Sequence, residues 1–179
     1  FQQLFSVVKI MLSLQKINGN EKIIFMRELD LVLVNETTNC TIYSIQFVSE
    51  DESEFEKFYK MFKDDAEYNP DLVRIVAFIN KIAEKGAFER FFRPEGKLSD
   101  RVVALPVVSS KLRLYALRLS DKILILGNGG VKCTRTYNED DVLKGYVMTL
   151  QKLDRLLKKN VEDGVITITE TTIETDKSF

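Results

Sequence analysis

The sequence predicts an α+β fold, in which an antiparallel β-meander has a two-helix hairpin packed on one face and a C-terminal helix. Two stretches with apolar residues at helical spacing come first, over 51–63 and 70–85. Four strand-length segments rich in Leu and β-branched residues follow over 101–136, separated by Ser-Ser, Ser-Asp and Gly-rich turns. Because these connections are short, an antiparallel meander is the simplest topology.

The length of 179 residues and the apolar content of 45% fit one hydrophobic core. We expect three regions along the chain. Residues 41–160 form the main domain, residues 1–40 form an N-terminal extension, and residues 161–179 form a C-terminal strand or tail.

The extension is predicted to begin with an amphipathic helix over 1–17, since polar Gln, Ser and Lys interrupt its apolar residues. Asn18-Gly19-Asn20 predicts a turn. Residues 21–36 then alternate enough to form two short strands or one bent strand. The alternation over 41–48 predicts the first strand of the main domain.

Local signals place the predicted helices. The acidic segment 50–54 lies at the start of the first helix, where negative charge favours a helix N-terminus. Asn69 is the expected N-cap of the second helix, with Pro70 in its first turn and Gly86 after its end. Residues 138–141 are expected to cap the last helix, which ends near residue 160.

The predicted strands of the meander cover 101–108, 112–119, 122–126 and 131–136. Gly127-Asn128-Gly129-Gly130 separates the last two, and we interpret it as a hairpin turn with positive φ angles. A phosphate-binding loop is disfavoured because it requires a Lys-Ser or Lys-Thr pair that opens a helix. Residues 164–175 alternate as an edge strand or a partly ordered tail would.

Several classes of protein are disfavoured by composition. No segment approaches the ~20 consecutive apolar residues of a membrane-spanning helix, so we expect no membrane partner. The chain has no histidine, and Cys40 and Cys133 are far apart in the sequence, so neither a metal site nor a cofactor is predicted. The two cysteines could pair, but such low cysteine content favours a reducing compartment, and we expect the cytoplasm.

The charge distribution is uneven along the chain. Residues 85–159 hold 16 Lys and Arg against 8 Asp and Glu, although the whole chain has a net charge of −1. Such a basic segment can bind phosphate backbones or an acidic partner, or it can be ordinary solvated surface. If it is functional, the negative N-terminal region could cover it within the same chain.

Lysine and arginine on a sheet can grip a scissile phosphate and stabilise the charge that builds up during transfer. RNA supplies its own nucleophile, the 2′-hydroxyl. A ribonuclease therefore needs neither a metal nor histidine if Lys or Tyr moves the protons and Arg holds the phosphate oxygens.

The meander also resembles a known family. The segment 114–118 (Leu-Tyr-Ala-Leu-Arg), the apolar strand 123–126, the Gly-rich turn, the basic segment 131–136 and the last helix resemble the RelE/HigB/ParE superfamily of bacterial type II toxins. The resemblance covers residues 41–159, and the predicted helix pair lies where that family has its helical hairpin. It implies a small sheet with two helices on one side.

The resemblance implies ribosome-dependent cleavage of mRNA, with a cognate antitoxin as a second partner. Arg118 matches the arginine of the family, which would bind the scissile phosphate, and Lys132 matches the first lysine of its basic segment. Arg135 and Tyr137 are predicted as further catalytic groups. Ala116 and Cys133 replace the glutamate and the second lysine of the family pattern. Nucleic acid is expected to contact Lys111, Arg113 and Lys122.

Three functions remain open from the sequence. An mRNA-cleaving toxin requires Lys, Arg and Tyr to converge on one concave face. ParE-like members share the fold but inhibit DNA gyrase, and an exposed apolar helix pair would favour that function. A catalytically silent binding module is the third.

Overall fold

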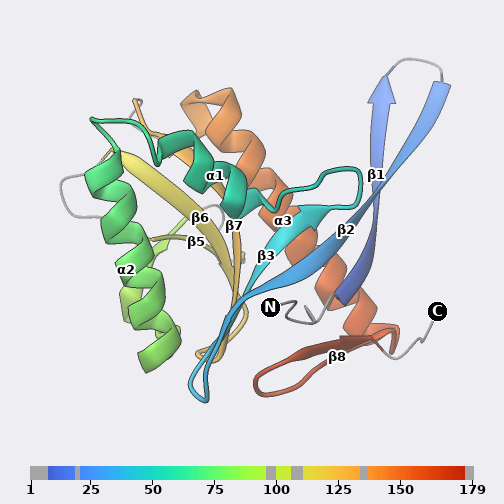
Figure 1. Cartoon of the computed structure of the whole chain (residues 1–179). Helices are drawn as coiled ribbons and strands as arrows, with labels where there is room; N and C mark the ends of the chain where they lie inside the picture. Colours follow the sequence, from blue (N-terminus) through green and yellow to red (C-terminus); the bar gives the residue numbers. More distant parts are fainter. Residues whose placement is uncertain (1–7, 19–20, 96–99, 106–110, 134–136, 176–179) are drawn as a thin grey trace.

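A computed structural model of the chain describes residues 8–18, 21–95, 100–105, 111–133 and 137–175. The fold is α+β, as predicted, with one large sheet and helices on both of its faces (Figure 1). The helices are α1 (Glu54–Phe62), α2 (Asn69–Lys85) and α3 (Asp141–Glu162), with 3-10 turns η1 (Glu89–Phe91) and η2 (Tyr137–Glu139). The strands are β1 (Val8–Asn18), β2 (Glu21–Glu36), β3 (Thr41–Phe47), β4 (Arg93–Pro94), β5 (Val102–Ala104), β6 (Leu112–Arg118), β7 (Ile123–Val131), β8 (Ile166–Ile168) and β9 (Ile173–Thr175).

The large sheet has the strand order β1-β2-β3-β7-β6-β5-β4, and β8 and β9 form a separate two-stranded sheet. Strands β5, β6 and β7 form an antiparallel meander of three strands, where four were predicted. Residue 131 of the fourth predicted strand ends β7, and residues 134–136 lie outside the described residues. The pair β3 and β7 is parallel, which the sequence did not predict. A parallel pair needs a long crossover, and the segment from α1 to β6 supplies it.

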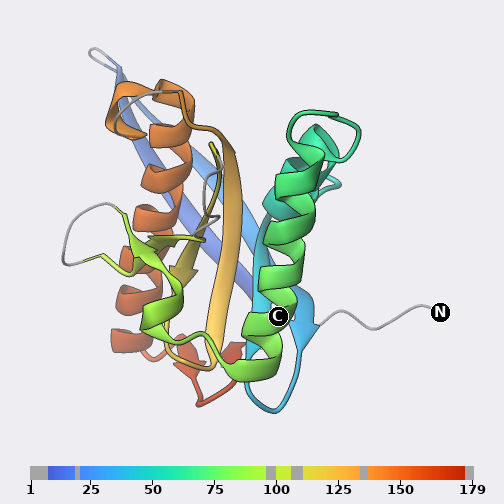
Figure 2. The same cartoon turned by 90° about the vertical axis from the view of Figure 1, so that its left-hand side faces the viewer.

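The sheet separates two hydrophobic cores, as Figure 2 shows with α2 on one side and α3 on the other. Alternate residues of β6 serve the two cores because successive side chains of a strand point to opposite faces. Leu112, Leu114 and Ala116 pack in the core with α1 and α2. Tyr115 and Leu117 pack in the core with α3.

The helices begin and end close to the predicted positions. Ser53 caps α1 through a capping box, in which its hydroxyl accepts from the Glu56 amide and the Glu56 carboxylate accepts from the Ser53 amide. The prediction that Asn69 caps α2 is wrong. Tyr68 occupies the N-cap, and the Asn69 side chain donates instead to the Lys63 carbonyl, at 2.7 Å. Gly86 ends α2 with a φ of 101°, a conformation that favours glycine.

The predicted N-terminal helix is wrong. Residues 8–18 form the edge strand β1, which pairs with β2 along its whole length, while residues 1–7 lie outside the described residues. The apolar residues over 8–14 also alternate with period two, so pairing with β2 decides between helix and strand. Strand β2 is the single bent strand of the prediction, with a bulge between Leu33 and Asn35.

The Gly-rich turn predicted at 127–130 is also wrong, because these residues lie inside the continuous strand β7. Positive φ angles occur at Gly86 and Gly164 and at no other glycine of the described part of the chain. The glycines of β7 instead allow neighbouring atoms to pack closely against the strand. A Cβ atom at Gly127 would lie 3.1 Å from Leu150 of α3, and one at Gly129 would lie 1.8 Å from the Arg113 carbonyl oxygen.

Beyond α3 the chain forms the β8–β9 hairpin, whose Ile166 and Ile173 are buried against the α3-side core. The predicted edge strand is thus two short strands. Among the described residues, no helix has both the length and the apolar character needed to cross a bilayer.

A buried ionic cluster fastens α3 to the sheet. Asp154 of α3 is 1% exposed, and its carboxylate accepts from Arg101 next to β5, at 2.6 Å, and from Lys158, at 2.7 Å. Removing one partner of a buried charge leaves that charge poorly compensated. We expect Arg101→Met to lower the free energy of unfolding by about 1–3 kcal/mol. Lys158→Met removes a more exposed ion pair and should cost at most about 1 kcal/mol in urea unfolding. Equal losses from the two substitutions would contradict this role for Arg101.

Candidate nucleic-acid interface

The structure does not bring Arg118 and Lys132 together. Arg118 ends β6 opposite Leu124, beside the β6–β7 turn. Lys132 follows β7 at the other end of this hairpin, where its amide donates to the Lys111 carbonyl at 2.8 Å. At a rise of ~3.3 Å per residue, the two positions are about 20 Å apart along the strands.

The two residues also serve different faces of the sheet. Arg118 continues the alternation of Leu114 and Ala116 toward the α2 side, where its Nε donates to the Ala87 carbonyl at 2.6 Å. Its Nη2 pairs with Asp121. This guanidinium therefore holds the chain after α2 against the β6–β7 turn.

Arg113, and not Arg118, lies near Lys132 on the same face of the sheet. It lies between Leu112 and Leu114, so it belongs to the α3 side of β6, at the end where Lys132 leaves β7. Arg113, Lys132 and Arg93 all lie close enough to the Glu95 carboxylate to lower its pKa. We call Arg93, Arg113 and Lys132, gathered around Glu95, the basic face.

Glu95 is the carboxyl group among the three cations of the basic face. It directly follows β4, and its amide donates to the Val102 carbonyl at 3.1 Å. Burial raises the pKa of this carboxyl group above its ordinary value, and the three cations offset the rise only in part. A carboxylate with a raised pKa among cations is a candidate proton acceptor.

Two tyrosines adjoin the basic face. Tyr115 is fully buried, and its hydroxyl finds no hydrogen-bond partner within the described part of the chain. Burial, followed by the Glu95 charge, raises its pKa. The half-buried Tyr137 packs edge-on against it, with ring centroids 6.4 Å apart. Tyr137 therefore lies beside the basic face.

The other predicted residues divide between the two ends of the hairpin. Lys111 is exposed and its carbonyl bonds to Lys132, so it belongs with the basic face. Lys122 lies at the far end, where its ammonium pairs with Glu170. Arg135 lies outside the described residues.

The sequence did not single out Arg93 and Glu95 of the basic face, or the adjoining Tyr115. Arg93 and Glu95 flank Pro94 on the two-residue edge strand β4, which pairs with β5. Proline is tolerated at such an edge because it has no amide hydrogen to donate. The sequence signal for a strand this short is weak.

Metal-ligand clusters and disulfides are both absent from the described residues. No group of three or more Asp, Glu or Cys side chains there could hold a metal ion. The two cysteines are unpaired: Cys133 is exposed, and burial raises the pKa of Cys40 to about 11.

Residues 1–40 do not carry the negative charge that would cover the basic face, since they hold four Lys and Arg and four Asp and Glu. Strand β1 also forms the sheet edge opposite β4. The idea of an acidic N-terminal cover is therefore wrong. The excess of negative charge lies in residues 41–84 and 160–179.

Comparison of the chain with protein-family models, curated proteins and solved structures finds no match.

Replacing Glu95 tests its environment. Because burial raises the pKa of the Glu95 carboxyl group, the folded protein binds a proton at Glu95 more tightly than the unfolded chain does. The ionised carboxylate therefore lowers stability at neutral pH, and the penalty disappears as the pH falls through the folded-state pKa. We expect Glu95→Gln to be more stable than wild type near pH 7, with the difference shrinking toward pH 4 in urea unfolding. The exposed Glu84→Gln is the control, and an equal gain there would refute the assignment.

Proposed function

We propose that this chain carries a RelE-like toxin domain, which binds mRNA on the ribosome through the basic face and cleaves it. The observation that carries the proposal is the gathering of Arg93, Arg113 and Lys132 around Glu95. Three cations on one sheet face can hold a phosphate backbone, and a partly buried carboxyl group among them can exchange a proton.

The order of the elements supports the proposal. A helix pair, a three-stranded antiparallel meander and a long terminal helix follow one another along the chain, as the resemblance to that superfamily implies. The support is limited to architecture, because a fold of this kind hosts different functions. The residues of the basic face therefore bear the functional argument.

The cleavage we propose is an internal phosphoryl transfer. Glu95 accepts the proton of the 2′-hydroxyl, whose oxygen forms a bond to the adjacent phosphorus. Arg113 holds the phosphate oxygens while negative charge builds on them. The bond to the 5′-oxygen breaks, and the Lys132 ammonium supplies its proton. The products are a 2′,3′-cyclic phosphate and a 5′-hydroxyl.

Induced expression in a bacterial host tests the function. Translation and DNA replication are followed separately, and mRNA ends are mapped by primer extension. Translation arrest with cleaved mRNA is the expected result, and Glu95→Gln should suppress it. Normal growth with intact mRNA would contradict the proposal. An antitoxin with an acidic segment that covers the basic face would restore growth.

Inhibition of DNA gyrase is the second candidate. Three large apolar or aromatic side chains of the α1–α2 pair favour it, since Tyr59, Met61 and Val73 are 44%, 53% and 58% exposed. An exposed apolar helix surface is suited to binding another protein. DNA damage without mRNA cleavage in the same experiment would favour this function over RNA cleavage.

A further inference from the structure

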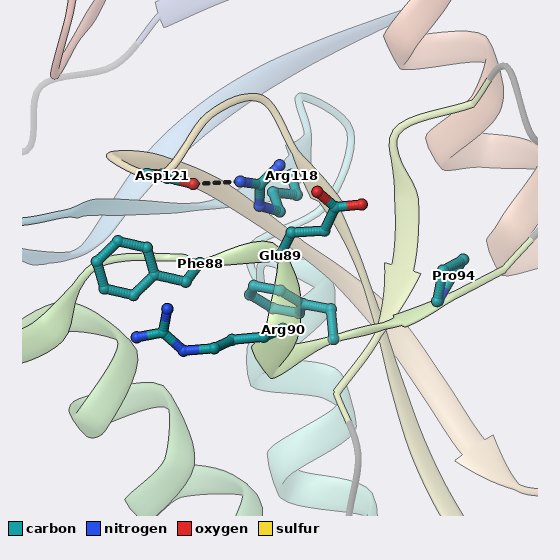
Figure 3. A pocket seen from close by; sticks show the side chains of 7 residues that line it. Phe88, Glu89, Arg90, Pro94, Arg118 and Asp121 are labelled. Atoms are coloured by element: carbon teal, nitrogen blue, oxygen red, sulfur yellow. Dashed lines mark hydrogen bonds and ion pairs between the residues drawn. The ribbon is translucent and has the colours of Figure 1, made fainter.

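A pocket lies on the α2 side of the sheet, away from the basic face. Its volume is about 640 Å³, and Figure 3 shows Phe88, Glu89, Arg90, Pro94, Arg118 and Asp121 around it. This volume lies within the range of small-ligand sites. No step of the proposed cleavage uses these side chains.

The pocket is built by the docking of the chain after α2 onto the β6–β7 turn. The Ala87 amide donates to the Asp121 carbonyl at 2.5 Å, and the Ala87 carbonyl accepts from Arg118 Nε at 2.6 Å. Asp121 pairs with Arg118 Nη2. Arg118 Nη1 is the guanidinium nitrogen with no acceptor among the described residues. The guanidinium of Arg118 is thus held in place, and its Nη1 group remains available to donate to a ligand.

Aromatic rings and a second guanidinium form the wall of the pocket. The Arg90 guanidinium lies 4.5 Å from the centroid of the Phe88 ring and 5.2 Å from that of the Phe91 ring. Of these residues, Phe88 and Arg90 line the pocket, together with Phe92. Alternating rings and cations are the surface on which the bases of single-stranded nucleic acid stack.

The charges of the pocket select against a phosphate group. The carboxylates of Glu89 and Asp121 balance the cations Arg90 and Arg118. The fitting occupant is flat and uncharged, with hydrogen-bond donors and acceptors on one edge. Guanine has this edge, since its adjacent N1–H and N2–H groups can donate to a carboxylate and its O6 can accept from a guanidinium.

Strand β4 joins the pocket to the basic face. Pro94 lines the pocket, while its neighbours Arg93 and Glu95 belong to the basic face. An RNA strand bound by the basic face can therefore reach the pocket around this sheet edge. We propose that the pocket binds an unpaired guanine of that RNA, an inference that rests on the proposed function.

Guanosine alone tests the pocket, because this nucleoside has no phosphate for the basic face to bind. We expect guanosine, and not uridine, to shift the NMR amide signals of Ala87, Phe88 and Asp121. Glu89→Gln and Asp121→Asn should each weaken guanosine binding by about 3- to 10-fold, as for loss of one hydrogen bond to a charged group. Glu84→Gln, on the exposed end of α2, is the matched control.

Labelled octanucleotides test the link to RNA. Oligouridine with one central guanosine should bind wild type more tightly than pure oligouridine, and Glu89→Gln should abolish the difference. A preference that survives in both pocket variants, or guanosine shifts that do not involve these amides, would overturn the inference. Guanosine binding without RNA binding would keep the pocket and reject both the RNA link and the proposed function. RNA binding without guanosine binding would reject the pocket and its link to RNA, and keep the proposed function.

Discussion

Gly129→Ala is expected to prevent β6 and β7 from pairing in their native register. A Cβ atom at this position would lie 1.8 Å from the Arg113 carbonyl oxygen and 2.9 Å from the Leu114 Cα atom. Both atoms belong to the backbone, so no side-chain rotation can relieve the clash. We expect a loss of more than about 4 kcal/mol in the free energy of unfolding, the range reached when packing cannot relax. Circular dichroism and urea unfolding measure it.

The matched control is Gly145→Ala on the exposed side of α3, where an added Cβ atom meets no atom within 4 Å. Alanine in a helix interior is favoured over glycine by about 1 kcal/mol, so this variant should be more stable than wild type. If Gly129→Ala instead unfolded at the same urea concentration as wild type, the strand assignment of residues 127–130 would be wrong.

The second large effect is expected at the basic face. Arg113→Gln and Lys132→Gln each remove a cation near Glu95. In the proposed cleavage, Arg113 stabilises the charge on the phosphate and Lys132 protonates the leaving oxygen. We expect each substitution to lower the rate of mRNA cleavage in a cell-free translation reaction by about 100-fold or more. The rate is measured by primer extension on a defined message.

Lys122→Gln is the control for this prediction, since this cation lies at the other end of the β6–β7 hairpin and is paired with Glu170. Arg118→Gln is measured beside it, because Arg118 lines the pocket and lies away from the basic face. We expect cleavage rates within a few-fold of wild type at saturating message. A loss at Arg118 as large as that at Arg113 would return the catalytic role to Arg118.

The helices were predictable because their signals are local. Apolar spacing and end signals place α1, α2 and α3 within a few residues of the structure, and Gly86 ends α2 as expected. Strand β1 was not predictable in this way, since residues 8–14 fit both a helical and a strand period. Its pairing with β2 is set by contacts along a hairpin that no single window of sequence reveals.

Arg118 is the expected catalytic arginine because it matches the family pattern, and a turn at 127–130 is compatible with that expectation. A turn there would place Lys132 on a separate strand, free to return toward Arg118. The continuous strand β7 instead fixes Lys132 opposite Lys111. Since strand residues alternate between faces, the same register places Arg113 on the side of Lys132 and Arg118 on the other. Glu95 reaches the basic face because β4 pairs with β5 at the edge of the sheet. A strand of two residues can hardly be predicted from sequence.

The salt dependence of RNA affinity tests most directly whether the basic face binds phosphate. Fluorescence anisotropy with a labelled oligouridine gives the dissociation constant of wild type, Arg113→Gln, Lys132→Gln and Arg118→Gln from low to high salt. The slope of log affinity against log salt should become shallower by about 1 for Arg113→Gln and for Lys132→Gln, and stay unchanged for Arg118→Gln. Unchanged slopes for both basic-face variants, or a change at Arg118→Gln alone, would contradict the placement of the interface.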